Sequence, residues 1–409
     1  MAASTRSFGL ADAARITERC FVPDQRPCDQ VGLELEWLTI DRRRPDDRVE
    51  PDDLRPALPE SLPAGGSISF EPGGQIELNT APYDHLATLL DAARADADAI
   101  RRSLAAEGVE LIAQGLDPVR PPSRVLRTAR YEAMEATFAA DGRSGLLMMC
   151  NSAALQLNVD LDAAGARWRL ADRLGPVLAA TFANSPFVDG APSGLKASRL
   201  ANWWRIDPSR TAPVATDRDP CRAWLEYALD ARVLLVRADD NHYVAQPVPR
   251  SFREWMDHGD ELGWPTADDF AYHLTTLFPP IRPRGWLELR MIDAVDDDLW
   301  AVATALTTAL LCDAEASQVA AEACEPVAGR WEDAARRGLS DADFAEAALV
   351  CTVAARDALG RDPATKALAD DVDEFLAEYV ARGRCPADDL LDRWARTGAL
   401  LAPSPELVS

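Results

Sequence analysis

Strict alternation of apolar and polar residues marks four segments of this chain as half-buried β-strands. In the first segment, Glu34 and Glu36 alternate with large apolar residues. A pleated strand sends such alternating positions to opposite faces. The four segments cover about residues 30–40, 67–80, 154–162 and 285–292, and shorter strands are expected at 109–114, 233–237 and 243–247.

The helical period of 3.6 residues accounts for most of the remaining chain. Helices are expected near 11–21, 84–107, 130–140, 163–183, 251–257 and 266–278, and almost continuously from about 296 to 398. The connection 42–66 is rich in Pro, Asp and Arg, which predicts a long exposed segment. Residues 184–213 are expected to be irregular. Because no repeat or linker interrupts the pattern, one α+β domain over 1–409 is expected, with a largely helical C-terminal part.

The four alternating strands share one property: each has a polar face of acids and amides. Residues two apart on a strand lie about 6.6 to 7 Å apart on the same face. If the apolar faces pack on one helical layer, the polar faces combine into a single concave surface. Its members would be Glu34 and Glu36, then Gln75, Glu77 and Asn79, then Gln156, Asn158 and Asp160, and finally Glu288 and Arg290.

Two interpretations of that surface stay open at this point. An antiparallel sheet with one solvated face needs no function at all. However, solvated faces generally recruit Lys, Thr and Ser, whereas these positions hold Glu, Gln, Asn and one Arg. Clustered carboxylates repel one another unless a cation joins them. Since carboxylate oxygen is the ligand that Mg²⁺ prefers, the pattern favours a magnesium-holding surface.

The charge balance narrows the classes of partner. The chain has 67 acidic and 43 basic residues, a net charge of -24, and its only lysines are Lys196 and Lys366. That imbalance argues against nucleic acid or an anionic membrane, since both need a basic footprint. Any phosphate-bearing substrate would have to be neutralised by arginine or by a divalent metal.

The chain shows no membrane-length apolar run and no signal pattern, so a cytoplasmic protein is expected. Its eight cysteines contain no Cys-x-x-Cys, which favours reduced thiols, and its four histidines lack zinc-ligand spacing. A monomer or weak homo-oligomer is expected.

A Pro-Gly-Gly turn at 72–74 lies between Glu71 and Glu77. Glycine allows backbone conformations closed to other residues and a close approach to a ligand. No phosphate loop, Gly-x-Gly-x-x-Gly or Gly-x-Ser-x-Gly occurs, so nucleotide binding would use another geometry. Further on, Arg199 and Arg210 could bind a substrate carboxylate, or could pair with the abundant acids.

At these residues the chain resembles the glutamate–cysteine ligases of the plant-like, carboxylate–amine ligase branch. The matching elements run in the family's order over roughly residues 30–295. They are Gly-Leu-Glu-Leu-Glu at 32–36, Phe-Glu-Pro-Gly-Gly-Gln-Ile-Glu-Leu at 70–78, Arg-Tyr-x-x-Met at 130–134, Gln-x-Asn-x-Asp at 156–160, Phe-Ala-Asn-Ser-Pro-Phe at 182–187, Arg-Thr at 210–211 and Leu-Glu-Leu-Arg at 287–290. The arginine-rich, lysine-poor composition is similar to that of the actinobacterial subgroup that supplies γ-glutamylcysteine to ergothioneine synthesis.

The resemblance implies a glutamine-synthetase-like fold, in which a curved antiparallel sheet backed by helices forms a funnel-shaped active site. The implied magnesium ligands are Glu34, Glu36, Glu71, Glu77 and Glu288. The implied catalytic residues are Glu288 and Arg290, with Arg290 meeting the ATP phosphates, and Gln75 would also contact the nucleotide. The implied substrate-binding residues are Tyr131, Gln156, Asn158, Arg199, Trp203 and Arg210.

The activity that the resemblance implies is ATP-dependent ligation of the γ-carboxylate of L-glutamate to the amine of L-cysteine through a γ-glutamyl phosphate. Phosphoryl transfer needs positioning and charge neutralisation more than covalent help. Mg²⁺ and Arg290 would supply that neutralisation in so acidic a protein. The alternatives are a ligase of the same fold that uses another amine, a phosphagen-type kinase, and a non-catalytic acidic binding protein.

Overall fold

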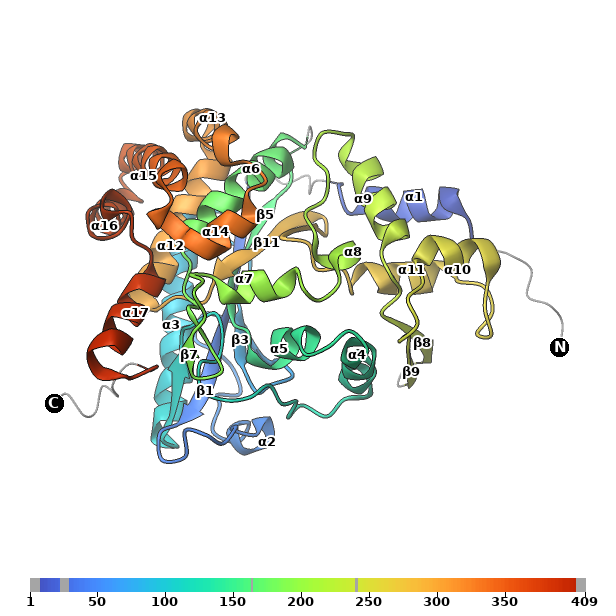
Figure 1. The fold of residues 1–409 in the computed structure, drawn as a ribbon. Helices are drawn as coiled ribbons and strands as arrows, with labels where there is room; N and C mark the ends of the chain where they lie inside the picture. Colours follow the sequence, from blue (N-terminus) through green and yellow to red (C-terminus); the bar gives the residue numbers. More distant parts are fainter. Residues whose placement is uncertain (1–7, 23–28, 163–164, 240–241, 402–409) are drawn as a thin grey trace.

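The computed structural model describes residues 8–22, 29–162, 165–239 and 242–401. An antiparallel sheet runs through its centre, with the strand order β10-β11-β5-β1-β3-β2, and β4 also pairs with β1 (Figure 1). Its strands are β1 (Val31–Asp41), β2 (Ser67–Phe70), β3 (Ile76–Asn79), β4 (Val109–Ile112), β5 (Ala154–Asp160), β10 (Ile281–Pro283) and β11 (Trp286–Asp293).

The predicted two-faced character of the strands is confirmed. In β1 the side chains of Leu33, Leu35 and Trp37 are at most 3% exposed, and in β5 and β11 the alternate leucines are fully buried. β1 is central, since β5 and β3 pair with it on opposite sides and β4 pairs with its last four residues. The apolar face of the sheet therefore belongs to the core, and the polar face points away from it.

The predicted strand over 67–80 is a hairpin. β2 and β3 pair with each other, Phe70 opposite Ile76, and the chain reverses at Glu71–Gln75. Gly74 has a φ of 88°, a left-handed conformation that glycine adopts without steric cost. The alternation continues across the turn because both arms of the hairpin present the same faces, and for this reason the sequence pattern looked like a single strand.

Three helices cover the apolar face of the sheet, and their buried residues join those of the strands in one core cluster (Figure 1). α3 packs on β1, α12 on β5, and α6 on β11. Their ranges are α3 (Leu86–Ala106), α6 (Ala166–Thr181) and α12 (Asp297–Cys312). The predicted helices 84–107 and 163–183 are thereby confirmed, apart from residues 163–164, which lie outside the described residues.

The opposite side of the sheet is faced by shorter helices that carry a second apolar cluster (Figure 1). α7 packs on β11, α5 packs on both α4 and α7, and α4 packs on β9. Their ranges are α4 (Ala129–Ala139), α5 (Ser144–Asn151) and α7 (Ser198–Trp203). α5 was not predicted, and α7 lies in the stretch that was expected to be irregular.

Most of the remaining small elements extend this side of the molecule away from the sheet, whereas β7 is seen near β1 in the view of Figure 1. Helices α1, α9, α10 and α11 pack on one another, next to the β8–β9 hairpin. These elements are α1 (Leu10–Arg19), α8 (Pro208–Thr211), α9 (Pro220–Asp230), α10 (Phe252–His258), α11 (Ala267–Leu274), β6 (Phe187–Val188), β7 (Ala191–Pro192), β8 (Leu235–Asp239) and β9 (His242–Ala245). α9 was missed, and α11 is shorter than the predicted 266–278.

The chain after α12 is helical as predicted, and α13, α14, α15 and α16 pack on α6 or α12 (Figure 1). The helices of this part are α13 (Ala314–Ala323), α14 (Trp331–Arg337), α15 (Ala342–Arg361), α16 (Lys366–Glu378) and α17 (Pro386–Thr397), joined by 3₁₀ turns at Glu325–Val327, Gly338–Ser340 and Val380–Arg382. Among the described residues no single helix has the length and apolarity to cross a membrane; only Asp298–Cys312 with Ala314–Ala323, bent by 97°, has them as a pair.

The connection between β1 and β2 is only partly exposed, contrary to the expectation for 42–66. It contains a short helix, α2 (Pro51–Leu54). The side chains of Leu54 and Leu62 are 2% and 6% exposed and belong to the main core. The backbone amides of Ala64 and Gly66 donate to the buried carboxylate of Asp96 on α3, at 2.6 and 2.9 Å. The composition indicated a loop, but these long-range contacts fix it on the protein.

Candidate active site

Strand register brings the predicted polar residues onto one face of the sheet. Glu36 of β1 lies opposite Glu77 of β3, and Glu34 lies opposite Gln156 of β5. On the next pair, Asn158 of β5 lies opposite Glu288 of β11. Cross-strand partners point to the same side of a sheet, so the acids and amides that are distant in sequence form one continuous polar surface.

A cavity of about 290 Å³ opens over this polar surface. Its floor is formed by side chains of β1, β3, β5 and β11, together with Glu71 and Pro72 of the hairpin turn. Its walls are side chains of α4, α5, α7 and the loop after α11. These wall residues are Arg130, Tyr131, Met134, Met148, Met149, Arg199, Trp203, Thr275 and Phe278.

Neutral amides hold two of the acids on the floor. Gln156 donates its amide to Glu36 at 2.6 Å, and the Ala154 backbone amide donates to the other oxygen of Glu36 at 2.9 Å. Asn158 donates to Glu34 at 3.0 Å. These donors fix the orientation of each carboxylate without cancelling its charge.

Glu77 is held in the same way, by Asn79 at 2.8 Å and by the Ser69 hydroxyl at 2.7 Å. Both partners come from the same hairpin. The side chain of Glu77 is therefore fixed by β2 and β3 before any ligand arrives.

The acids destabilise one another as charged groups. Burial raises the pKa of Glu71 to about 7, and the nearby charge of Glu77 adds to the effect. Burial likewise raises the pKa of Glu36 well above its usual range, with Glu77 and Glu71 as the next causes. The pKa of Glu34 is raised by burial and by Glu288. A cation among these carboxylates would relieve both the burial and the repulsion.

Arg290 is a cation beside these acids, and it lies at an irregularity in the sheet. Between Leu289 and Ile292 the pairing of β11 with β5 shifts register, so two residues of β11 face one residue of β5. Such bulges re-aim side chains. Arg290 donates to Gln156 at 2.6 Å and pairs with Glu288 at 3.2 Å.

Two arginines that line the cavity keep a buried donor without a partner. Among the described residues, the Nε atoms of Arg130 and Arg290 are buried and donate no hydrogen bond. Buried unpaired donors are rare in native proteins and often mark the place of a ligand or water. With Arg282 and Arg284 also on the lining, the cavity joins an acidic floor to a cationic side.

Comparison with known proteins agrees with this arrangement. The model of the family described as "Glutamate-cysteine ligase family 2 (GCS2)" matches residues 30–404. This chain belongs to the glutamate–cysteine ligase family. The glutamate–cysteine ligase EgtA of Mycolicibacterium smegmatis is 41% identical over 92% of this chain and 90% of that protein. The chloroplastic glutamate–cysteine ligase of Nicotiana tabacum is 30% identical over 56% of this chain and 45% of that protein.

The fold is shared with a solved structure at much lower identity. The bifunctional glutathione synthetase from Pasteurella multocida matches with a TM-score of 0.51 and 14% identity, over 95% of this chain and 52% of that one. The expected α+β class with an antiparallel sheet is thus confirmed. The family membership and its plant-like branch, which the sequence motifs implied, are confirmed as well.

Most of the residues that the motifs implied for this ligase do meet around the cavity. Glu34, Glu36, Glu71 and Glu77 lie on its floor. Gln156 lies there too, while Asn158 stands just outside the lining, bound to Glu34 and to the Trp286 indole. Their roles as ligands or binding residues stay predictions.

Two aromatic residues named for substrate binding form part of the wall. Burial raises the pKa of Tyr131 to about 12, and the charge of Glu71 adds to the shift. Trp203 is buried, donates its indole to the Phe278 carbonyl at 2.7 Å, and has Arg290 5.6 Å from its ring centroid. Trp203 therefore packs beside the Arg290 guanidinium.

The structure places Arg210, which was predicted to hold a substrate carboxylate, away from the cavity lining. Its side chain is 1% exposed and is absent from the cavity lining. Its guanidinium donates to Asp207 at 3.0 Å, to the Thr276 carbonyl at 2.8 Å and to the Arg232 carbonyl. Every nitrogen thus binds a protein group, and Arg210 joins α8 to the segments around it.

Arg199 disagrees with its predicted role in a similar way. It touches the cavity, but it is 2% exposed and binds Asp293 at 2.7 Å. Its Nη2 donates to the carbonyls of Arg290 and Ile292 at 3.1 and 2.9 Å. These two residues flank the irregular stretch of β11, so Arg199 stabilises the conformation that aims Arg290.

Gln75 lines the cavity, but its side-chain amide binds groups of the protein, and its predicted contact with the nucleotide stays a prediction. Its carbonyl accepts from the Gly73 amide at 2.9 Å. Its amide donates to the carbonyls of Ser152 at 2.8 Å and Met149 at 3.4 Å. Both ends of a 2% exposed side chain are therefore occupied within the protein, where they join the hairpin turn to the end of α5.

Glu288 pairs with arginines, which disagrees with its predicted role as a metal ligand. It is fully buried, and Arg282 binds both of its oxygens, one of them at 2.8 Å. Arg284 and Arg290 lie at 3.4 and 3.2 Å. Burial by itself would raise the pKa of Glu288, but Arg282 and Arg290 outweigh it and hold that pKa well below its usual range.

Sequence reasoning missed the arginines that complete the site. Arg130 stood in the matched Arg-Tyr-x-x-Met element, so the motif could have revealed it. Arg282 and Arg284 belong to an Arg-Pro-Arg sequence just before β11, the strand of Glu288. The first two residues of this sequence lie in β10, which pairs antiparallel with β11. Arg282 lies opposite Glu288 across the β10–β11 pair, a relation that appears only when the hairpin is formed.

Whether Mg²⁺ fits this site depends on the number of protein ligands that the ion requires. In the part of the chain that the structure describes, no three acidic, His or Cys side chains converge as a ready metal cage. Mg²⁺ is usually bound by one or two carboxylates plus phosphates and waters, rather than by an all-protein cage. Carboxylates with raised pKa values that face a cavity, such as Glu71 and Glu36, fit that mode.

Proposed function

We propose that this cavity is where the ligase joins the γ-carboxylate of L-glutamate to the amine of L-cysteine, using ATP and Mg²⁺. The supporting observation is the composition of one enclosed space: mutually repelling glutamates on its floor and buried arginines with unpaired donors at its side. A triphosphate and divalent cations match these two charge sets. The funnel-shaped, glutamine-synthetase-like form of the site is part of this proposal.

The proposed metal-holding residues are Glu71, Glu77, Glu36 and Glu34. When Mg²⁺ is bound, it supplies charge neutralisation and orientation for the nucleotide phosphates. The residues named here leave it room for phosphate and water ligands, since the hairpin acids and the β1 acids come from different strands. Glu288 is assigned instead to the arginine cluster, as its counter-charge.

Chemistry in the site proceeds in two steps. A carboxylate is a poor electrophile, so the γ-carboxylate of glutamate first attacks the γ-phosphorus of ATP, which releases ADP and forms the acyl phosphate. The cysteine amine then attacks the acyl carbon, phosphate leaves, and the amine loses a proton as the amide forms. Arg290 faces the charge that develops on the transferred phosphoryl group, where a preorganised cation acts most strongly.

Several contacts hold the Arg290 side chain in position. Its pKa is raised because the acids Glu288, Glu34 and Glu36 outweigh the effect of burial, so it stays protonated. Gln156 accepts from it at 2.6 Å, and Trp203 lies beside it. The backbone bulge fixes its entry into the cavity.

The first experiment is a coupled ADP-release assay across pairs of amino acids. ADP release that requires both glutamate and cysteine is expected, with γ-glutamylcysteine as the product. Release with another amine in place of cysteine would identify a ligase of different specificity, and phosphorylation without joining would identify a kinase. Hydroxylamine should trap the acyl phosphate as a γ-glutamyl hydroxamate.

Substitutions of Glu77 on the cavity floor and of Arg290 test the roles proposed for these two residues. Glu77→Gln should lower the turnover by about 10²- to 10³-fold, the size expected when transition-state electrostatics are lost. Arg290→Ala should do the same, while circular dichroism stays that of the parent protein. Parent-like rates in both variants would contradict the proposed site.

The pathway is proposed from the relatives. The proteins at 39–41% identity are named EgtA, and their length agrees with that of this chain. We place the present ligase in the same subgroup, which supplies γ-glutamylcysteine to ergothioneine synthesis. The monomeric or weakly oligomeric state and the cytoplasmic location stay predictions.

A further inference from the structure

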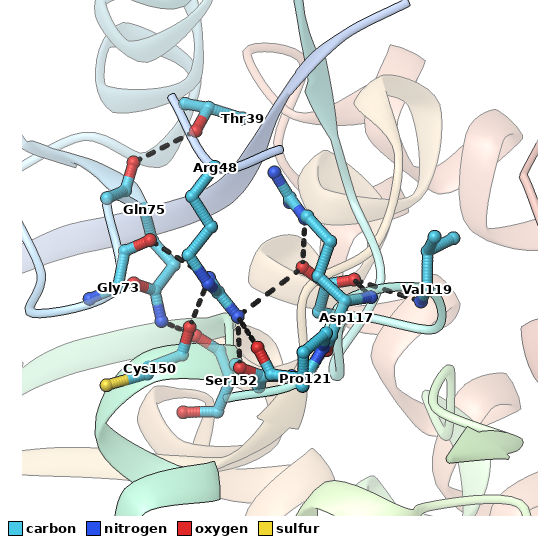
Figure 2. A network of polar contacts seen from close by, with 12 residues as sticks. Thr39, Arg48, Gly73, Gln75, Asp117, Val119, Pro121, Cys150 and Ser152 are labelled. Atoms are coloured by element: carbon cyan, nitrogen blue, oxygen red, sulfur yellow. Dashed lines mark hydrogen bonds and ion pairs between the residues drawn. The ribbon is translucent and has the colours of Figure 1, made fainter. Parts of the chain in front are cut away.

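The segment that joins β1 to β2 reaches the active-site turn through one buried arginine. Arg48 lies in the first third of this connection, and its side chain is 8% exposed. Figure 2 shows its guanidinium between the hairpin turn, the end of α5 and the loop at 117–121. Three segments distant in sequence therefore meet at one side chain.

The guanidinium donates to four acceptors of the protein and also lies 3.9 Å from the Asp117 carboxylate. Nη1 donates to the carbonyls of Gly73 at 3.0 Å and Cys150 at 2.9 Å. Nη2 donates to the Pro121 carbonyl at 2.9 Å and to the Asn151 side chain. Cys150 and Asn151 are the last residues of α5, where free carbonyls make a cation favourable.

The turn itself is tied to the protein at each of its carbonyls. The Pro72 carbonyl accepts from the backbone amides of Val125 and Leu126, at 2.8 and 3.0 Å. The Gly73 carbonyl accepts from Arg48, and the Gly74 carbonyl accepts from the Thr39 hydroxyl at 3.1 Å (Figure 2). Arg48 is the charged member of this set.

The turn and α5 lie in direct contact at the position that Arg48 bridges. A Cβ atom added to Gly73 would come within 2.0 Å of the Cys150 carbonyl. At this contact Arg48 Nη1 donates to both the Gly73 and the Cys150 carbonyl, so one donor group joins the two segments. Removing it would leave two buried acceptors unpaired, which favours separation of the turn from α5.

Both elements carry parts of the cavity. Glu71 begins the turn, and its carbonyl accepts from the Gly74 amide at 2.9 Å, so its position follows that of the glycines. α5 places Met148 and Met149 in the cavity wall. A change in the distance between the turn and α5 therefore moves Glu71 relative to the wall.

We propose that Arg48 is a positioning residue of this ligase: by holding the Gly73 and Cys150 carbonyls together, it sets Glu71 at the metal-holding floor of the cavity. On this basis the connection 42–66 is a fixed structural segment that supports the active-site turn, and it is not a lid. This inference rests on the proposed role of Glu71 in holding Mg²⁺.

The test compares Arg48→Met, Arg48→Lys and the parent chain by their dependence on Mg²⁺. Loss of a residue that supports a metal ligand typically costs about 10–100-fold in metal affinity or activity. The Mg²⁺ concentration that gives half-maximal ADP release should rise by that factor in Arg48→Met. In Arg48→Lys this Mg²⁺ concentration should rise less, because an ammonium keeps the charge and can reach one of the two carbonyls.

A second readout does not need turnover. With a non-hydrolysable ATP analogue present, Mg²⁺ should raise the thermal unfolding midpoint of the parent chain, and this rise should be reduced in both Arg48 variants at the same Mg²⁺ concentration. If Arg48→Met does not fold, the inference is tested with Arg48→Lys alone, by its Mg²⁺ dependence of ADP release and its unfolding midpoint.

Arg120→Met is the matched control for a loss of stability alone. Arg120 is a buried arginine of the same network, but it binds Asp117 at 2.7 Å and the Asp47 carbonyl at 3.3 Å, and does not contact the turn. This control should lower the unfolding midpoint and keep the Mg²⁺ dependence of the parent chain. An equal shift in Arg120→Met, or no shift in either Arg48 variant, would overturn the inference.

Glu71→Gln separates this inference from the proposal on which it rests. If Glu71→Gln raises the Mg²⁺ requirement and the Arg48 variants do not, only the positioning role fails. If Glu71→Gln leaves the requirement unchanged, Glu71 is not a metal-holding residue, and both ideas fail together.

Discussion

At the scale of single residues, the fully buried carboxylate of Glu288 depends on guanidinium groups for its charge. Arg282→Met removes the partner that binds both of its oxygens. Breaking one side of a buried ion pair typically destabilises a protein by about 3–5 kcal/mol, because a charge is left uncompensated. Urea denaturation should show a loss of this size.

The double variant Arg282→Met with Glu288→Leu supplies the control for this prediction. Since the uncompensated charge is gone, much of the lost stability should return. If the double variant is no more stable than Arg282→Met alone, the loss comes from packing around Arg282 and not from the charge of Glu288.

His273 gives a prediction about pH at a distance from the active site. It is 2% exposed, Nε2 lies 2.9 Å from the Ala228 carbonyl, and burial together with the charge of Arg210 lowers its pKa from 6.5 to about 3. Between these values the unfolded chain binds a proton that the folded chain does not. The stability is therefore complete above pH 6.5 and decreases as the pH falls toward 3.

The size of this effect follows from about 1.36 kcal/mol per pH unit for one proton. Between pH 6.5 and 4.5, His273 should cost the parent chain about 2–3 kcal/mol of unfolding free energy. His273→Gln, which keeps a donor for the carbonyl, should lack this part of the decrease. Parallel stability curves for the two proteins over that range would refute the prediction.

At the scale of elements, the Glu71–Gln75 turn leaves no space for a side chain at Gly73. Gly73→Ala would place a methyl group within 2.0 Å of the Cys150 carbonyl, so the turn or α5 must move. Overpacking of this kind usually costs about 1–3 kcal/mol. Thermal unfolding should detect that loss, and the activity should fall with it because Glu71 moves with the turn.

Gly65→Ala is a useful comparison, since Gly65 also has a positive φ, 82°, but no atom lies within 4 Å of an added Cβ. It tests backbone strain without steric contact. A fall in activity equal to that of Gly73→Ala would show that strain in this region is enough, and that contact with α5 is not the cause.

The strands and their faces could be predicted from the sequence because a period of two is a local property. The acids of β1 and β3 therefore entered the site as predicted. The hairpin within 67–80 and the short helix α5 could not, since the first preserves alternation and the second, with Leu146–Met149 in a row, has no clear period. α9 was missed although Asp219 and Pro220 form a recognisable helix start, with Asp219 accepting from the Arg222 amide.

The arginines show where sequence reasoning ends. Arg199, Arg210 and Arg282 each bind a carboxylate, as an arginine should, but the carboxylates are those of Asp293, Asp207 and Glu288. A guanidinium distinguishes a substrate acid from a protein acid only by what the fold places beside it. The motif gave the type of contact, and the tertiary structure supplied its partner.

At the scale of the whole molecule, the sheet and the C-terminal helices share one apolar core. A single cluster of buried residues runs from Leu33 of β1 to Val372 and Phe375 of α16, and α6 packs against α13, α14 and α15. A chain that ends after Cys312 should therefore fail to unfold cooperatively and should bind hydrophobic dyes. A sharp thermal transition in that fragment would instead show that the sheet folds without the helices.

The saturated carbonyls of the hairpin turn also bear on the thermodynamics of ligand binding. Since Pro72, Gly73 and Gly74 are already ordered by Val125, Arg48 and Thr39, the conformational entropy of the turn is lost during folding. A ligand of the proposed site then does not have to order this turn, and preorganisation of this kind raises affinity by avoiding that cost. The heat-capacity change on binding should accordingly reflect only the surface that the ligand itself covers.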